Sequence, residues 1–319
     1  MTAGVMSTSP ETVIEVDGLR KVYGATVAVD EVSFEVRRGE VFGVIGPNGA
    51  GKTTTVECVS GLRVPDAGAL RVLGLDPRGD RAHHVRDRVG VQLQQSAVPA
   101  RLKVREVLWL YASFYENPAD PDALLRTLGL MEKRETPYRK LSGGQKQRLS
   151  IALALIGNPQ IAVLDELTTG LDPQARQETW SLIEAVRDRG VTVLLVTHFM
   201  DEAERLCDRL ALIDEGRVVA HGTPAEVAER AGGGKRVRFR PSGPFDDALL
   251  TALPQVSTVT RHGSRISVTG REDLVNALIL TLDRAGIAAH DVELETPGLE
   301  DAFIALTRHR ASTTSNAEG

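Results

Sequence analysis

Residues 43–55 have the sequence Gly-Val-Ile-Gly-Pro-Asn-Gly-Ala-Gly-Lys-Thr-Thr-Thr. Four of them complete the spacing G-x-x-x-x-G-K-T of a phosphate-binding loop, namely Gly46, Gly51, Lys52 and Thr53. The apolar residues 41–45 predict a buried strand before the loop, and residues 52–60 predict a helix after it. In that context the glycines let several backbone N–H groups converge on one anion, and the helix dipole adds positive potential there. A chance glycine-rich turn would lack the flanking strand and helix, so the stretch predicts a phosphate site.

The ligands predicted for this loop are a nucleoside triphosphate and Mg²⁺. We expect Lys52 to reach the β- and γ-phosphates and the hydroxyl of Thr53 to ligate Mg²⁺. The other loop residues that we expect to contact the nucleotide, besides Gly46 and Gly51, are Asn48, Gly49 and Thr54.

Composition and charge limit the class of protein. The chain has 319 residues, which favours two domains, and its 42% hydrophobic and 25% charged content is that of a globular protein. A net charge of -5 gives no overall basic field for nucleic acid, so we expect no nucleic-acid partner. The two cysteines, Cys58 and Cys207, lack metal-ligand spacing and indicate a reducing compartment. We recognise no signal peptide and no run approaching the ~18 apolar residues of a membrane span, so we expect membrane association only through a partner.

The pattern of elements divides the chain into two predicted domains. The first covers residues 12–231 and the second residues 235–309, with a boundary at the glycine run 232–234. Residues 1–11 and the tail 310–319 are small and polar, and we expect both to be disordered.

Each predicted domain has a characteristic fold pattern. In the first, residues 13–36 predict an antiparallel β subdomain, and residues 104–157 predict a helical subdomain broken by prolines. Continuous apolar strands alternate with helices there, which is typical of a parallel sheet covered on both faces in an α/β fold. The predicted strands of that sheet are residues 41–45, 89–94, 161–164 and 191–196. The second domain has the order βαββαβ, which predicts a small α+β domain of ferredoxin-like type, with a short helix at 245–253 and a last helix at 299–308.

Polar residues follow two of the buried strands. Asp165 and Glu166 end the strand at 161–164, and His198 follows the strand at 191–196. An Asp-Glu pair after a strand is usually a solvated strand end. Ligands of such sheets bind at the carboxyl ends of the strands, and the phosphate loop also follows the carboxyl end of a strand. Together with that loop, the pair is better interpreted as part of a ligand site. We therefore expect Asp165 in the Mg²⁺ shell and Glu166 to orient or deprotonate an attacking water.

A second glycine-rich segment precedes another predicted helix. Its sequence is Leu141-Ser142-Gly143-Gly144-Gln145. Ser142 is a good N-cap, and the two glycines leave backbone N–H groups accessible, so the segment is a second candidate anion cradle. An ordinary capped helix start is the alternative interpretation.

With these motifs in this order, residues 12–230 resemble the nucleotide-binding subunit of an ABC transporter, a phosphate-loop ATPase. The resemblance implies that ATP is the nucleotide. It also implies that Ser142, Gly143, Gly144 and Gln145 bind the ATP of a second subunit, so that two chains form a head-to-tail homodimer. The loop Gly170-Leu171-Asp172 would cross that dimer interface.

The resemblance assigns roles to further residues. Tyr23 stands where the family places an aromatic ring that stacks on adenine, and His198 where a histidine contacts the γ-phosphate. Gln94 best fits the glutamine that senses Mg²⁺ and the γ-phosphate, although Gln92 and Gln95 are close enough to leave the register open. One departure is Leu167, where the family usually has a proline that fixes the backbone after the catalytic glutamate.

The end of the chain narrows the predicted function. Residues 297–307 resemble the closing helix of ATPases that serve exporters of the daunorubicin-resistance type, whose membrane subunits are separate chains. This implies an ATPase that energises export of a drug-like or lipid-like compound from the inner face of the cell membrane, held there by a membrane permease. Two alternatives remain open. One is an importer ATPase with a regulatory C-terminal domain. The other is a soluble ABC-type ATPase acting on nucleic acid, which usually has a coiled-coil insertion or two cassettes, neither found here.

Overall fold

The computed structural model divides the chain into two compact units, Met1–Thr223 and Pro224–Gly319. The division precedes the helix α8 (Pro224–Arg230), whereas the sequence placed the end of the first domain at residue 231. The predicted boundary at 232–234 lies outside the described residues, as do residues 1–10 of the stretch 1–11 for which disorder was predicted. Glu11 is described, and its carboxylate pairs with Arg38 at 2.8 Å. The structure describes residues 11–92, 98–230, 235–270, 273–295 and 298–315.

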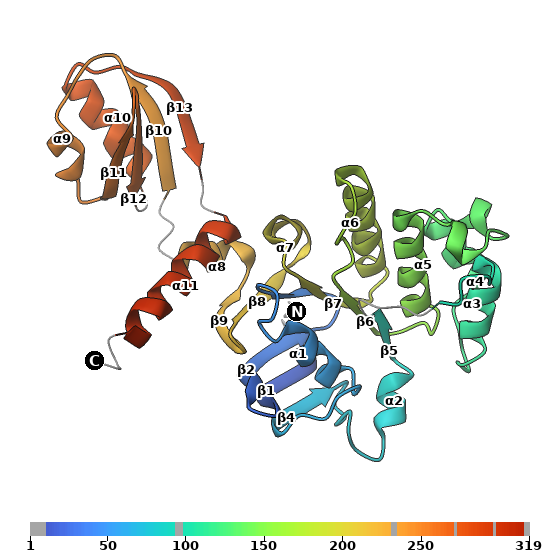
Figure 1. The fold of residues 1–319 in the computed structure, drawn as a ribbon. Coiled ribbons are helices and arrows are strands. Elements are labelled where there is room, and N and C mark those ends of the chain that lie inside the picture. The colour runs from blue at the N-terminus through green and yellow to red at the C-terminus, as the bar shows by residue number, and fades with distance from the viewer. Residues whose placement is uncertain (1–10, 93–97, 231–234, 271–272, 296–297, 316–319) are drawn as a thin grey trace, which may run out of the picture. The chain divides into compact units, whose positions relative to one another are not determined.

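A six-stranded sheet forms the centre of the first unit (Figure 1). Its strands, in spatial order, are β5 (Val89–Gln92), β6 (Ile161–Asp165), β7 (Thr192–Thr197), β3 (Val41–Ile45), β8 (Arg209–Asp214) and β9 (Arg217–Gly222). The first five are parallel to one another and β9 is antiparallel to β8. All residues of β3, β6 and β7 are buried, as continuous apolar strands between two covering layers should be. Their carboxyl ends therefore meet at one edge.

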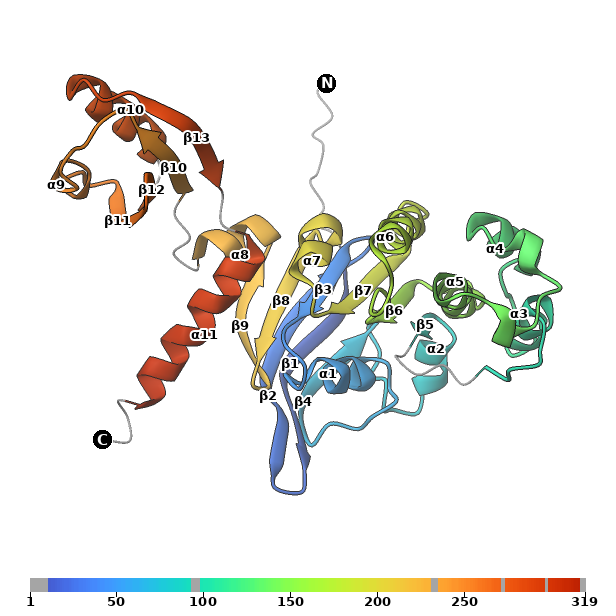
Figure 2. The same cartoon turned by 45° about the horizontal axis from the view of Figure 1, so that its top comes forward.

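A second, antiparallel sheet packs against this core. It contains β2 (Thr26–Arg37), β1 (Thr12–Tyr23) and β4 (Ala67–Val72) in that order. The helix α1 (Lys52–Val59) shares one hydrophobic core with both sheets, and the rings of Phe34 and Phe42 stack across it with centroids 5.2 Å apart. Figure 2 shows α1 beside the antiparallel sheet.

Helices complete the first unit. They are α2 (Ala82–Arg86), α3 (Val104–Ala112), α4 (Pro121–Thr127), α5 (Gly143–Leu155), α6 (Pro173–Arg187) and α7 (Met200–Leu206), with 3₁₀ turns at Met131–Lys133 and Tyr138–Lys140. As predicted, prolines divide the helical subdomain. Pro121 occupies the first turn of α4, and the side chain of Asp120 caps it by accepting from the backbone N–H of Asp122. The helix α2 was not predicted from the sequence, and it has one buried residue, Val85.

The second unit contains a four-stranded antiparallel sheet with the spatial order β11, β12, β10, β13. Its elements are β10 (Lys235–Pro241), α9 (Ala248–Thr251), β11 (Val256–His262), β12 (Arg265–Gly270), α10 (Leu274–Arg284) and β13 (Ala289–Glu295). This order is the one expected for a ferredoxin-like βαββαβ unit. The core on the helix side includes Phe239, Leu250 and Leu278. The same unit holds α11 (Leu299–Ser315), which packs against α8.

Two predicted boundaries in the second unit were wrong. The helix predicted over 245–253 is only α9, because the side chain of Asp246 accepts from the N–H of Ala248 and fixes the helix start there. The last helix, α11, continues through Ser315, although disorder was predicted from residue 310. No glycine or proline occurs between Leu299 and Ser315, so nothing in that sequence ends the helix earlier. Among the described residues, no helix combines the length and apolar character that crossing a membrane requires.

Candidate active site

The phosphate loop joins the end of β3 to the start of α1, and its glycines are required by close backbone contacts. Gly46 has a φ of 155°, and a Cβ atom there would lie 2.0 Å from the carbonyl oxygen of Ile213. Gly51 has a φ of 97°, and its Cβ atom would lie 2.2 Å from the carbonyl oxygen of Ala28. Any larger residue would displace backbone at either position, so the loop keeps this shape only with glycine.

Lys52 lies over the loop that it follows. Its ammonium donates to the carbonyl oxygens of Gly46 and Pro47, at 2.9 Å each. Burial lowers the pKa of Lys52, and the nearby carboxylates of Glu166 and Asp165 oppose that effect. An ammonium has three donors, so this geometry leaves one for an anion in the loop.

A cavity of about 300 Å³ lies against the loop. The residues that line it are Ala28, Asn48, Gly49, Gly51, Lys52, Thr53, Thr54 and Glu166. The structure thus brings Glu166 to the same cavity as six loop residues that the sequence analysis selected, although more than a hundred residues separate them.

Asp165 and Thr53 form a pair whose chemistry fits a divalent cation. The Thr53 hydroxyl lies 3.3 Å from Asp165 Oδ2, while Asp165 Oδ1 is buried without a hydrogen-bond partner among the described residues. Burial, reinforced by the negative charge of Glu166, raises the pKa of Asp165 to about 6. A buried carboxylate with one unused oxygen beside a hydroxyl could hold Mg²⁺, which needs only one or two protein ligands when phosphates supply others. In the described part of the chain, no cluster of three or more His, Cys, Asp or Glu residues offers another metal site.

Glu166 and His198 are in contact at the carboxyl edge of the sheet. His198 Nδ1 lies 3.2 Å from Glu166 Oε1, so the Nδ1–H form of the ring donates to the carboxylate. The backbone of Glu166 has a φ of 50°, in the left-handed region, and its N–H donates to the carbonyl oxygen of Val196 at 2.9 Å. Leu167, which replaces the family's proline, has a fully buried side chain.

A buried carboxylate behind these residues was missed by the sequence analysis. Glu202 of α7 is fully buried, and its Oε1 accepts from the indole N–H of Trp180 on α6 at 3.0 Å. Burial raises the pKa of Glu202. The hydroxyls of Thr197 and Thr168 are near enough to lower that pKa, although Glu202 Oε2 makes no hydrogen bond of ordinary geometry to any described residue. Glu202 therefore ties α7 to α6 through Trp180. In the sequence it is one acid among several in a short helix, and nothing marks it as buried.

The second glycine-rich segment forms the N-terminus of α5. The Ser142 hydroxyl accepts from the N–H of Gln145, and the Gln145 side chain accepts from the N–H of Ser142, so the predicted cap is a reciprocal capping box. The segment lines a cavity of about 310 Å³ together with Gly170, Leu171 and Asp172. This cavity shares no lining residue with the one at the phosphate loop. Within one chain, the two anion cradles are therefore separate.

Tyr23 and Gln92 are not among the residues that line the phosphate-loop cavity. Tyr23 ends β1 and is partly exposed, with Arg63 5.2 Å and Lys21 5.6 Å from its ring centroid. Gln94 and Gln95 lie outside the described residues. Gln92 is buried, and its side-chain oxygen accepts from the N–H of Asp165 at 3.2 Å, which ties β5 to β6 behind the metal-binding candidate.

Comparison with known proteins identifies the family. The family model described as ABC transporter matches residues 29–169. The Nod factor export ATP-binding protein I of Ralstonia nicotianae is 41% identical over 306 residues, covering 92% of this chain and 94% of that protein. The chain belongs to the ABC transporter family. This ABC ATPase is also 38% identical to the daunorubicin resistance ATP-binding protein DrrA3 of Streptomyces coeruleorubidus, over 93% of this chain and 96% of that one.

A solved structure supports the same conclusion for the fold. The structure described as the ATP-binding subunit of an ABC transporter aligns with a TM-score of 0.62 and 31% identity, over 69% of this chain and 94% of that one. The resemblance and the fold class predicted from the sequence are confirmed. The chain is an ATPase of the ABC family, and ATP is its nucleotide.

Proposed function

We propose that this ABC ATPase energises export of a drug-like or lipid-like compound through a separate membrane subunit. The observation that supports export most directly is the extent of similarity to the two relatives named for export and drug resistance. It covers more than nine tenths of the chain, so it includes the second unit and exceeds what a shared ATPase cassette needs.

The proposed reaction is attack of water on the γ-phosphate of ATP. Lys52 and the loop N–H groups bind the phosphates, and Thr53 and Asp165 hold Mg²⁺. When bound, Mg²⁺ neutralises charge on the phosphate oxygens. Glu166 accepts a hydrogen bond or a proton from the attacking water, because its carboxylate lines the same cavity as the loop.

Three further residues contribute to this proposed site. His198 holds the Glu166 carboxylate through Nδ1, and its ring contacts the γ-phosphate. Gln94 follows β5 and senses Mg²⁺ and the γ-phosphate. Tyr23, which is 40% exposed, stacks on the adenine.

The working form that we propose is a head-to-tail homodimer. In one chain the cavity of Ser142, Gly143, Gly144 and Gln145 is separate from the phosphate-loop cavity. A second copy facing the first in antiparallel orientation would place each capped helix N-terminus against the phosphates of the other chain, where its N–H groups and dipole stabilise negative charge.

An exposed apolar cluster on the helical subdomain is the surface that we propose for the membrane subunit. Trp109, Leu110 and Phe114 lie on or directly after α3, and Trp109 and Phe114 are 60% and 69% exposed. Large apolar side chains gathered on one surface are typical of an interaction site. Docking there would hold the ATPase at the inner face of the cell membrane.

The experiment is co-expression with the candidate permease, followed by membrane fractionation and transport assays in vesicles. ATP-dependent export of a fluorescent amphiphile, lost with Lys52→Ala, is the expected result. Trp109→Ala with Phe114→Ala should release the chain from the membrane fraction. Val64→Ala, at an equally exposed apolar position in the same unit, is the control and should not. ATP-dependent uptake, or transport that requires an external binding protein, would contradict the export proposal.

A further inference from the structure

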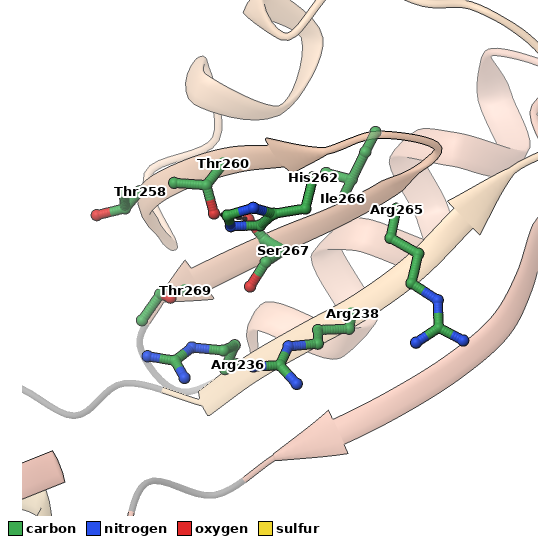
Figure 3. A pocket seen from close by; sticks show the side chains of 9 residues that line it. All are labelled: Arg236, Arg238, Thr258, Thr260, His262, Arg265, Ile266, Ser267 and Thr269. Atoms are coloured by element: carbon green, nitrogen blue, oxygen red, sulfur yellow. Dashed lines mark hydrogen bonds between the residues drawn. The ribbon is translucent and has the colours of Figure 1, made fainter.

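The sheet of the second unit carries a polar groove on the face opposite its hydrophobic core. The groove has a volume of about 720 Å³. Figure 3 shows the side chains that line it, which come from three adjacent strands. They are Arg236 and Arg238 of β10; Thr258, Thr260 and His262 of β11; and Arg265, Ile266, Ser267 and Thr269 of β12.

Strand alternation explains why these polar residues share one face. On β10, Val237 and Phe239 are buried in the core, so Arg236 and Arg238, which alternate with them, point to the other side. On β12, Ile266 and Val268 are buried in the same way. Packing of the core explains the apolar residue at every second position of these strands. It does not explain the arginines and hydroxyl residues that face the groove.

The arginines of the groove are incompletely neutralised. Arg236 and Arg238 both pair with Glu295, at 3.6 and 2.5 Å, so two guanidinium groups share one carboxylate. Arg265 is 3.9 Å from Glu293, at the limit of an ion pair. Among the described residues of the second unit, no acidic residue lines the groove itself. The groove therefore keeps a net positive charge and several uncommitted N–H donors.

We propose that this groove binds the phosphate group of a small anionic ligand. A guanidinium group donates two parallel hydrogen bonds to an oxyanion, and hydroxyls of Ser and Thr add single donors around it. The hydroxyl of Thr260 donates to the carbonyl oxygen of Ser267, which leaves the hydroxyls of Thr258, Ser267 and Thr269 for a ligand. Three guanidinium groups with three hydroxyls offer more donors than the two oxygens of a carboxylate ligand can accept, whereas a phosphate monoester presents three terminal oxygens. The volume is larger than a bare phosphate ion needs, so the ligand has a polar organic part as well.

This site is independent of ATP hydrolysis and of the export proposal. It uses strand side chains of the second unit, whereas the phosphate loop uses backbone N–H groups of the first. A soluble phosphate ester and the headgroup of a phospholipid present the same chemistry, and the experiment separates these two sources.

The test uses the full chain with Mg²⁺ and a non-hydrolysable ATP analogue at saturation, so that the phosphate loop is filled. Equilibrium dialysis measures binding of inorganic phosphate and of glycerol 3-phosphate. Sedimentation with vesicles of phosphatidylglycerol, compared with phosphatidylcholine, measures the lipid form. The variant is Arg236→Gln with Arg238→Gln. The matched control is Arg240→Gln, on the same strand but outside the groove and paired with Asp291 at 3.0 Å.

We expect saturable binding of one phosphate ligand per chain in the wild type and in the control. Binding should weaken at least about tenfold in the double variant, because charge-assisted hydrogen bonds are lost. Arg265→Gln alone should weaken it less, and all variants should keep wild-type ATP turnover and melting temperature. Arginine-dependent binding to phosphatidylglycerol vesicles without binding of soluble esters would identify a lipid headgroup. The proposal is overturned if neither form binds, or if binding is the same in the double variant.

Discussion

Replacing Glu166 with glutamine tests the proposed chemistry most directly. The amide has the same size as the carboxylate and retains one acceptor oxygen, so the 3.2 Å contact with His198 Nδ1 can persist. The backbone hydrogen bond from Glu166 to the carbonyl oxygen of Val196 is unaffected by the side chain. We therefore expect the fold and the position of His198 to be preserved.

Glu166→Gln has opposite electrostatic effects on two charged neighbours. The negative charge of Glu166 raises the pKa of Asp165 and opposes the burial that lowers the pKa of Lys52, so its removal helps Asp165 to ionise but gives the Lys52 ammonium less support. Removing that charge also removes a repulsion with the γ-phosphate. ATP affinity should stay unchanged or increase. Turnover should fall by about 10²- to 10⁴-fold, the usual contribution of a general base, which corresponds to about 2.7–5.5 kcal/mol of activation free energy.

The assay combines phosphate release at saturating ATP, titration with a fluorescent ATP analogue and size-exclusion chromatography in Mg²⁺-ATP. The variant should bind nucleotide, hydrolyse it slowly and accumulate as a dimer. Lys52→Ala is the contrasting control, since it removes a direct phosphate contact and should lose nucleotide affinity and the dimer. If Glu166→Gln hydrolyses ATP at close to the wild-type rate, Glu166 is not the catalytic carboxylate.

Three further substitutions give distinct expectations. Gly51→Ala should cost about 1–3 kcal/mol in unfolding free energy and abolish ATP binding, because its Cβ would lie 2.2 Å from a carbonyl oxygen; unchanged nucleotide titration would refute this. Ser142→Ala removes a helix cap and should cost about 1 kcal/mol in chemical denaturation while lowering turnover, whereas Ser142→Thr should retain both. Because burial raises the folded-state pKa of Glu202 above its ordinary value of 4.5, protonated Glu202 favours folding at low pH and that contribution is lost as pH rises through the raised pKa. The stability of Glu202→Gln relative to the wild type should therefore increase between pH 4.5 and 8 in urea unfolding, and a difference independent of pH would contradict the assignment.

The parts of the site that depend on local sequence could be predicted, and the parts that depend on distant contacts could not. The phosphate loop and the cap at Ser142 follow from residues within a few positions of each other, and the structure has both. The contact between Glu202 and Trp180 depends on how α6 packs against α7. Gln92 was one of three adjacent glutamines, and only the structure shows that its side chain accepts from the backbone of Asp165.

The backbone of Glu166 has a consequence for how this position evolves. A φ of 50° is unfavourable for glutamate, whereas glycine and asparagine adopt the left-handed region more readily. Under the proposed mechanism, catalysis requires a carboxylate here although the local conformation favours residues that cannot accept the water's proton. Selection for turnover and selection for stability therefore act in opposite directions on one codon. A descendant of this chain could form a dimer with a different partner, in which only one of the two nucleotide sites hydrolyses ATP. In the site that does not, we expect this glutamate to be among the first residues replaced, with asparagine or glycine in its place.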